Sequence, residues 1–191
     1  MMQSIVRTRS LMVELDLKDV SKLDSIIEYW SSSKSDRKKD IEPIVRSINA
    51  TEGVNALGIA HVLPPLARKL LYTYPSPNYS LHGSMPDCHW TTLNFFNFEP
   101  HQHLLDERFT TSFMKDKCIP AETPQRFGDF VFLSDPKSNE ILHSCVYLAD
   151  DLVYTKNGKN WLAPWVIMKL RDVSAIYSRD QNPKLSFLRL K

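Results

Sequence analysis

The chain has 191 residues, of which 42% are hydrophobic and 24% charged, a composition typical of a folded globular protein with one core. Its 24 basic and 22 acidic residues leave a net charge of +2, which gives no overall field toward nucleic acid or an anionic membrane. We therefore expect one compact unit without a nucleic-acid partner.

No segment approaches the roughly 18 consecutive apolar residues of a membrane span. The first residues carry charges but lack the apolar centre that a signal peptide requires. These two observations predict a protein without a membrane span that resides in the cytoplasm.

The first 80 residues show mainly helical patterns. Apolar residues recur at helical spacing over residues 19–30 and again over 40–49. The basic run over 33–40 contains acids, and we expect a solvated loop between these two helices. A third helix is predicted from about residue 55 to the pair Pro64 and Pro65, followed by a helical turn over 66–72. Residues 1–80 are thus predicted to form a helical region packed on the rest.

The second part of the chain, residues 81–191, changes its pattern near residue 127. Residues 87–98 predict a buried helix, because Asp87 is a good N-cap and Trp90, Leu93 and Phe96 share helical spacing. From Phe127 onward, short runs of period two predict antiparallel strands, with a tight turn at 149–151. Residues 161–178 favour a helix, and the alternation in the last run, LSFLRLK, predicts a strand that closes the sheet. The order of these elements predicts an α+β fold.

Three cysteines without a CxxC pair indicate neither a disulfide framework nor a four-thiolate zinc site. His82, Cys88, His89, His101 and His103 fit no common zinc spacing, so no metal is expected. The sequence also lacks a glycine-rich phosphate loop and the G-x-S-x-G pattern, and we expect no cofactor.

Cys88 stands where a reactive thiol would be expected. As the first residue of a helix capped by Asp87, it would lie among unpaired backbone N–H groups that favour the thiolate. His143 falls in a central strand, where its ring could accept the thiol proton. The alternatives are a buried inert cysteine and a hydrogen-bonded scaffold histidine.

Three segments together resemble one family. DCHWTTLNFFN resembles the nucleophile helix of the NlpC family of cell-wall cysteine peptidases, RFGDFVFLSD its Gly-Asp strand, and HSCVYLADDLVYTKNG its histidine hairpin. The resemblance spans residues 87–158 and implies a papain-like NlpC-type core, in which a nucleophile helix packs on an antiparallel sheet, here with an N-terminal helical extension.

The resemblance implies a role for each matching residue. Cys88 would attack a carbonyl carbon, His143 would be the general base, and Asp87 would bind a substrate amine or simply cap the helix. The residue that orients the histidine would be Thr155 in an ungapped alignment, or Asn157 if the hairpin is offset. The family's Ser-Gly after the cysteine is His89-Trp90 here, which fills space beside the nucleophile.

The implied activity is hydrolysis of a peptide or other amide, with a peptide or cell-wall-derived small molecule as substrate. Tyr74 and its neighbouring loop tyrosines would gate the substrate site or pack over the sheet. Two alternatives remain open: an acyltransferase or thioesterase of the same papain-like class, and an inactive NlpC-like binding module. The sequence does not define the oligomeric state.

Overall fold

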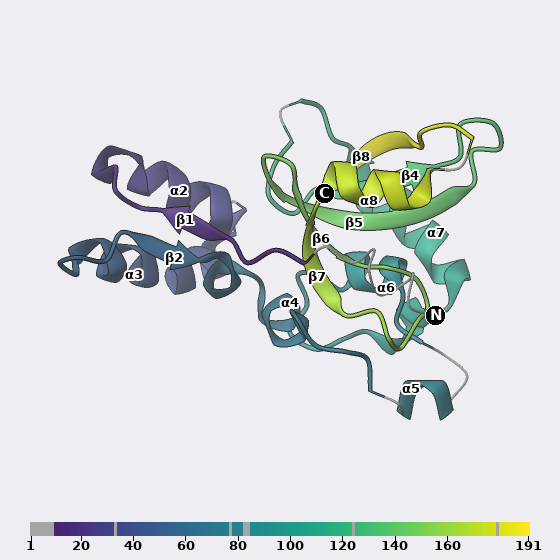
Figure 1. Cartoon of the computed structure of the whole chain (residues 1–191), viewed down its shortest axis with the longest axis horizontal. Coiled ribbons are helices and arrows are strands. Elements are labelled where there is room, and N and C mark those ends of the chain that lie inside the picture. The colour runs from purple at the N-terminus through teal and green to yellow at the C-terminus, as the bar shows by residue number, and fades with distance from the viewer. Residues whose placement is uncertain (1–9, 33, 77, 82–84, 124, 179) are drawn as a thin grey trace.

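The chain folds as α+β around one antiparallel sheet (Figure 1). The computed structural model describes residues 10–191 apart from 33, 77, 82–84, 124 and 179. The sheet has the strand order β3-β8-β4-β5-β6-β7. Its strands are β3 (Cys118–Pro120), β4 (Phe130–Ser134), β5 (Ile141–Ala149), β6 (Leu152–Lys156), β7 (Trp165–Lys169) and β8 (Lys184–Leu190). The predicted α+β class is therefore confirmed.

The two faces of the sheet bury different sets of side chains, because neighbouring residues of a strand point to opposite faces. Val146 and Tyr154 belong to the larger hydrophobic cluster, which includes residues of α6 (Cys88–Leu93). Cys145 and Val153 belong to a second cluster on the other face, beneath α8 (Leu170–Tyr177). Thus α6 and α8 lie on opposite faces of the same strands.

The prediction of antiparallel strands from Phe127 onward is confirmed in the middle of this segment and wrong near its end. Strands β5 and β6 are joined by the tight turn predicted at 149–151, where Asp150 has a φ of 50°. Residues 165–169, predicted as helix, form β7 instead. Both faces of this strand are buried, since Trp165 lies in one cluster and Val166 in the other. A strand buried on both faces reads as a continuous apolar run, which hides its period of two.

The N-terminal part of the described chain forms an arm beside the sheet (Figure 1). Its two short strands pair antiparallel, with Leu15 opposite Leu57. The elements of the arm are β1 (Glu14–Asp16), η1 (Val20–Lys22), α2 (Leu23–Ser31), α3 (Ser35–Ala50), β2 (Ala56–Gly58) and η2 (Ile59–Val62). The chain then continues outside the arm through α4 (Pro65–Leu70) and α5 (Asn78–Leu81).

Two predictions for the arm are wrong. Helix α3 begins at Ser35, so most of the predicted loop over 33–40 is helical. Its charged residues occupy the exposed side of the helix and leave Ile41 and Val45 on the buried side. The predicted helix from residue 55 is instead β2 followed by a 3-10 turn, because pairing with β1 buries Leu57.

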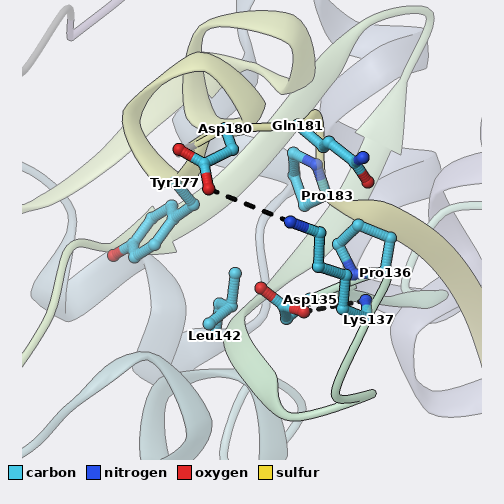
Figure 2. Close-up of a pocket in the computed structure, with 8 residues that line it drawn as sticks. All are labelled: Asp135, Pro136, Lys137, Leu142, Tyr177, Asp180, Gln181 and Pro183. Carbon is cyan, nitrogen blue, oxygen red and sulfur yellow. Dashed lines mark hydrogen bonds and ion pairs between the residues drawn. The ribbon is translucent and has the colours of Figure 1, made fainter.

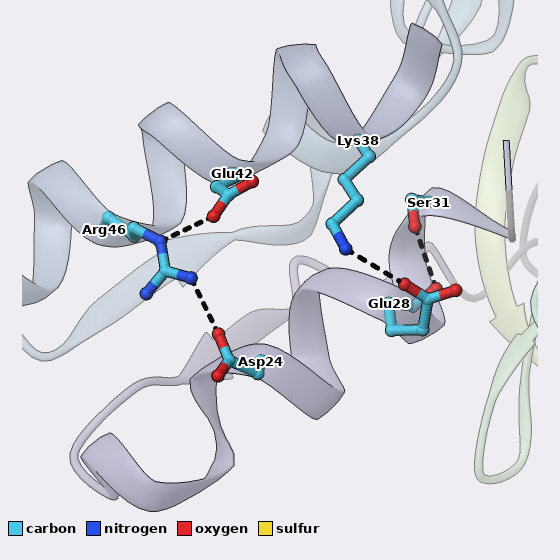
Figure 3. Close-up of polar contacts among 6 residues, drawn as sticks. All are labelled: Asp24, Glu28, Ser31, Lys38, Glu42 and Arg46. Carbon is cyan, nitrogen blue, oxygen red and sulfur yellow. Dashed lines mark hydrogen bonds and ion pairs between the residues drawn. The ribbon is translucent and has the colours of Figure 1, made fainter. Parts of the chain in front are cut away.

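Ion pairs join α2 to α3 at the surface (Figure 3). The guanidinium of Arg46 donates to Glu42 at 2.8 Å and to Asp24 at 2.7 Å, and Lys38 lies 3.4 Å from Glu28. Exposed pairs of this kind contribute about 0–1 kcal/mol each. The buried apolar side chains between the helices therefore stabilise the arm more than these pairs do.

The arm is attached to the sheet through aromatic packing. Trp30 of α2 contacts Phe127, which precedes β4, with ring centroids 4.8 Å apart. Arg37 of α3 donates to the backbone oxygens of Trp30 and Val62 at 2.7 and 2.8 Å. Residues of the arm and of the sheet consequently share one hydrophobic cluster.

A G1 bulge sets the start of β4 against β5. Gly128, with a φ of 89°, donates its N–H to the Tyr147 oxygen at 2.9 Å, and Tyr147 donates to the Asp129 oxygen at 2.8 Å. The buried Asp129 carboxylate accepts two hydrogen bonds from Arg189 of β8, at 2.7 and 2.8 Å. The Gly-Asp pair noted in the sequence therefore fixes the register of the strand that carries His143.

Two further elements precede β3, namely η3 (Gln102–Leu105) and α7 (Glu107–Lys117). Helix α6 is shorter than predicted, because the Asn94 side chain donates to the Trp90 oxygen at 3.0 Å and accepts from the His101 N–H at 2.7 Å. Within the described ranges, no helix combines the length and the apolar character needed to cross a membrane.

Candidate functional site

Helix α6 begins at Cys88, as predicted. The Asp87 carboxylate accepts a hydrogen bond from the Trp90 N–H at 2.8 Å, and the Thr91 hydroxyl donates to the Asp87 backbone oxygen at 2.6 Å. Lys159 lies 3.8 Å from the same carboxylate. Asp87 is thus the helix cap, which was one of its two predicted roles.

A chain of polar contacts anchors the first turn of α6 to β5. The Thr92 hydroxyl donates to the Cys88 oxygen at 2.9 Å, and the Ser144 hydroxyl donates to Thr92 at 3.1 Å. Because each hydroxyl has one hydrogen, the ring Nδ1 of His89 must be the donor to Ser144 Oγ, 2.8 Å away. His89 therefore holds the helix against the strand.

The strand pattern directs the Ser144 N–H toward β6. The backbone groups of Tyr147 bond to the bulge residues Gly128 and Asp129 before β4, and the residues that bond to a given neighbouring strand alternate along an antiparallel ladder. Cys145 and His143 thus turn their backbone groups to β4, whereas Ser144 turns its N–H to β6. In the described strands, the last residue pair of β5 with β6 at this end is Val146 with Tyr154, so the two strands part before Ser144.

The Cys88 thiol occupies this opening between the strands. The backbone N–H of Ser144 lies against the thiol, together with those of His89 and Cys88 itself. Burial and the neighbouring Asp87 carboxylate nevertheless raise the pKa of Cys88 to about 12. The predicted stabilisation of the thiolate by the helix start is present, but burial outweighs it and the thiol is protonated at neutral pH.

His143 lies on the α8 face with its ring fully buried. Its Nε2 lies 2.8 Å from the Thr155 hydroxyl, and its ring stacks on Tyr177 of α8 with centroids 4.2 Å apart. Burial lowers the pKa of His143 to about 3, with a smaller contribution from His89, so the ring is neutral at physiological pH. Its Nδ1 is buried and has no hydrogen-bond partner among the described residues.

The structure brings Cys88 beside the peptide that joins His143 to Ser144, but from the α6 side. Among the described residues, no hydrogen bond joins the Cys88 thiol to the His143 ring. Cys88 is 6% exposed and His143 is 0% exposed. In this closed arrangement a substrate has no direct access to the thiol.

Of the two residues predicted to orient the histidine, Thr155 contacts it. The Asn157 amide instead donates to the Met168 sulfur at 3.3 Å. Thr155 and His143 share the α8 face because each lies two residues from a member of the same cluster, Val153 and Cys145. The ungapped alignment therefore matches the contact that the structure shows.

The other predicted residues lie apart from the thiol's immediate contacts. Trp90 is buried, with its ring 6.3 Å from that of Trp165, and Tyr74 is 60% exposed on the connector after α4. His101 and His103 are exposed and stack on each other at 5.5 Å. No group of three or more metal-ligating side chains occurs within the described ranges, and His82 lies outside them.

Sequence reasoning missed two neighbours of the pair, Tyr177 and Lys156. Tyr177 falls at the end of a stretch predicted as one helix, and only the fold places it over His143. Lys156 follows Thr155 and, by strand alternation, shares the α6 face with Tyr154. The alternation of the strand requires a buried side chain at this position, and a lysine there was the signal that could have identified Lys156.

A cavity of about 150 Å³ lies on the other side of Tyr177, between the β4–β5 turn and the segment after α8 (Figure 2). Its lining residues are Asp135, Pro136, Lys137, Leu142, Tyr177, Asp180, Gln181 and Pro183. Lys137 and Asp180 lie 3.9 Å apart across it. The Tyr177 ring thus stands between this cavity and His143.

Comparisons with protein-family models, with curated proteins and with solved structures found no match for the chain.

Proposed function

We propose that the protein is a thiol hydrolase of the papain-like NlpC type, which cleaves a peptide or other amide bond through Cys88. The observation that carries the proposal is the orientation of His143. Its Nε2 is hydrogen-bonded to Thr155, and its Nδ1 is left buried without a partner beside the peptide that contacts the Cys88 thiol. A general base needs one nitrogen fixed and the other available.

The supporting architecture has three parts. The nucleophile candidate begins a capped helix, the histidine lies on a central antiparallel strand, and its hydrogen-bond partner lies on the next strand. These parts come from segments 55 and 67 residues beyond Cys88 in the chain, at His143 and Thr155. Cys88 lies beside the peptide that joins His143 to Ser144, and this order of a capped helix followed by antiparallel strands supports a papain-like core, which the sequence resemblance also implies.

The chemistry starts from a neutral thiol and a neutral imidazole. For the reaction, the His143 ring must reach the thiol through the opening between β5 and β6. Its Nδ1 then takes the thiol proton as Sγ attacks the carbonyl carbon, and the same nitrogen protonates the leaving amine as the C–N bond breaks. Water, deprotonated by His143, hydrolyses the thioester and restores the thiol. The backbone N–H groups at the start of α6 would stabilise the oxyanion. Because the Cys88 thiol is buried, the site must open for substrate to enter.

The burial of Cys88 favours a second candidate, an inactive binding module with the same core. Incubation with a mixture of short peptides, followed by mass spectrometry of the products, distinguishes the two candidates. The hydrolase proposal predicts cleavage by the wild type that is lost in Cys88→Ala and His143→Gln and retained in Cys118→Ala. Cleavage that persists in C88A would contradict the role of Cys88, and no cleavage of any peptide would favour the binding module.

A further inference from the structure

The one buried lysine of the described core faces the same opening as the Cys88 thiol. Lys156 ends β6 with a side chain that is 0% exposed, although lysine is almost never fully buried without compensation. Its Nζ donates to the backbone oxygens of Gly158 and Asn160 at 2.7 and 2.9 Å, and lies 5.8 Å from the centre of the Trp165 ring. These contacts hold the ammonium on the α6 side of the sheet.

The strand register places Lys156 across the opening from Ser144. Two residues beyond the pair of Val146 with Tyr154, β5 reaches Ser144 and β6 reaches Lys156. The Ser144 N–H contacts the Cys88 thiol, and Trp165, which packs near Lys156, donates from its indole to Thr91 of α6 at 2.9 Å. Helix α6 and Ser144 therefore border the thiol, and Lys156 lies on the strand that faces Ser144 across the opening.

The two carbonyl contacts do not by themselves explain why a charged side chain is buried here, because a neutral side chain would lose less hydration free energy on burial. Burial lowers the pKa of Lys156 to about 8, while Asp87 and Cys88 act in the opposite direction and favour the ammonium. The titratable groups around the opening are Asp87, Cys88 and His89 at α6, Lys159 after β6, and His143, Cys145 and Tyr177 on the α8 face.

We propose that Lys156 is a positioning residue for the nucleophile, whose ammonium charge stabilises the Cys88 thiolate within the closed site. The inference rests on the proposed function insofar as negative charge develops on the Cys88 sulfur when its proton is removed for the attack. The strand lysine would supply the stabilisation of the thiolate that the helix start alone does not provide here.

The test is the rate at which iodoacetamide alkylates Cys88, followed by mass spectrometry from pH 6 to 10. Lys156→Met and Lys156→Gln remove the charge, and Gln keeps a donor for the carbonyls. Both are expected to slow alkylation at pH 7.5 at least tenfold, which corresponds to one pKa unit. Lys156→Arg should retain most of the rate, and Lys38→Met, which removes an exposed ammonium in the arm, serves as the control. Equal rates in wild type and K156Q would overturn the proposal.

The wild type supplies a measurement that does not depend on how the variants fold. If the ammonium stabilises the thiolate, the tenfold rise of rate per pH unit must flatten near pH 8, where Lys156 loses its charge. A rise that stays tenfold per unit through pH 7–9.5 contradicts the proposal. A flattened profile without any peptide hydrolysis would retain this role of Lys156 and remove only the hydrolase function.

Discussion

The Thr155 hydroxyl and the Nε2 of His143 lie 2.8 Å apart on neighbouring strands, both fully buried. This contact fixes the ring while Tyr177 stacks on its face. The ring can therefore present its Nδ1 in one direction only. This restriction determines where the site can accept a proton.

Replacing Thr155 tests how much the histidine depends on its partner. Thr155→Val keeps the side-chain shape but leaves the buried Nε2 unsatisfied, which should lower the free energy of unfolding by about 1–3 kcal/mol. Thr155→Ser keeps the hydroxyl and should retain both the contact and the hydrolysis of peptides. Urea unfolding and product analysis measure the two effects. Equal hydrolysis by T155V and the wild type would show that the contact does not orient a base.

The buried His143 predicts a dependence of stability on acid. Its pKa is near 3 in the folded state, whereas a free histidine has a pKa of about 6.5, so between these values only the unfolded chain binds the proton. Stability must therefore fall as the pH falls from 6.5 toward 3, by up to about 1.4 kcal/mol per pH unit from this residue. Urea unfolding of wild type and His143→Gln at pH 4–6.5 should show a smaller slope for the variant. Identical slopes would contradict the neutral buried ring.

Asp129→Asn should be strongly destabilising. The carboxylate is 1% exposed and accepts two hydrogen bonds from Arg189, so the substitution removes the charge that faces a partly buried guanidinium. We expect a loss of roughly 3 kcal/mol of unfolding free energy. Asp36→Asn, in an exposed pair with Lys39, is the control and should change stability by less than about 1 kcal/mol. Similar losses in both variants would mean that the buried pair does not hold the register of β4.

A comparison of alanine variants at two glycines with positive φ distinguishes the stability lost to backbone strain from that lost to steric overlap. Gly128 has a φ of 89° and the Phe96 ring occupies the space of a Cβ, whereas Gly158 has a φ of 75° and open space. Gly158→Ala should lower stability by about 1–2 kcal/mol through strain alone. Gly128→Ala should lower it further, which thermal unfolding can measure. A smaller effect at Gly128 would contradict the close packing of Phe96 on the bulge.

Much of the fold could be predicted from local patterns. The helix start at Cys88, the hairpin at 149–151 and the antiparallel strands follow from a cap residue, a turn and a period of two. Strand β7 and the start of α3 could not be predicted in this way. The first is buried on both faces, and the second begins with charged residues on an exposed side. In both cases the tertiary environment decides the structure.

The candidate site could likewise be predicted only in part. The pairing of His143 with Thr155 follows from counting residues across the hairpin, because alternation places both on one face. The closure of the site does not follow from the sequence. It depends on the parting of β5 and β6, on the stacked Tyr177 and on the buried Lys156, which only the packed sheet brings to Cys88.

Covalent trapping tests the central claim that Cys88 is a nucleophile served by His143. The protein would be incubated with an activated acyl ester, and the acylated cysteines would be identified by peptide mass spectrometry in wild type, His143→Gln and Cys88→Ser. The account predicts a thioester on Cys88 that forms faster than any on Cys118 or Cys145, and that H143Q slows at least a hundredfold. Acylation spread equally over the three cysteines, or unchanged in H143Q, would contradict it.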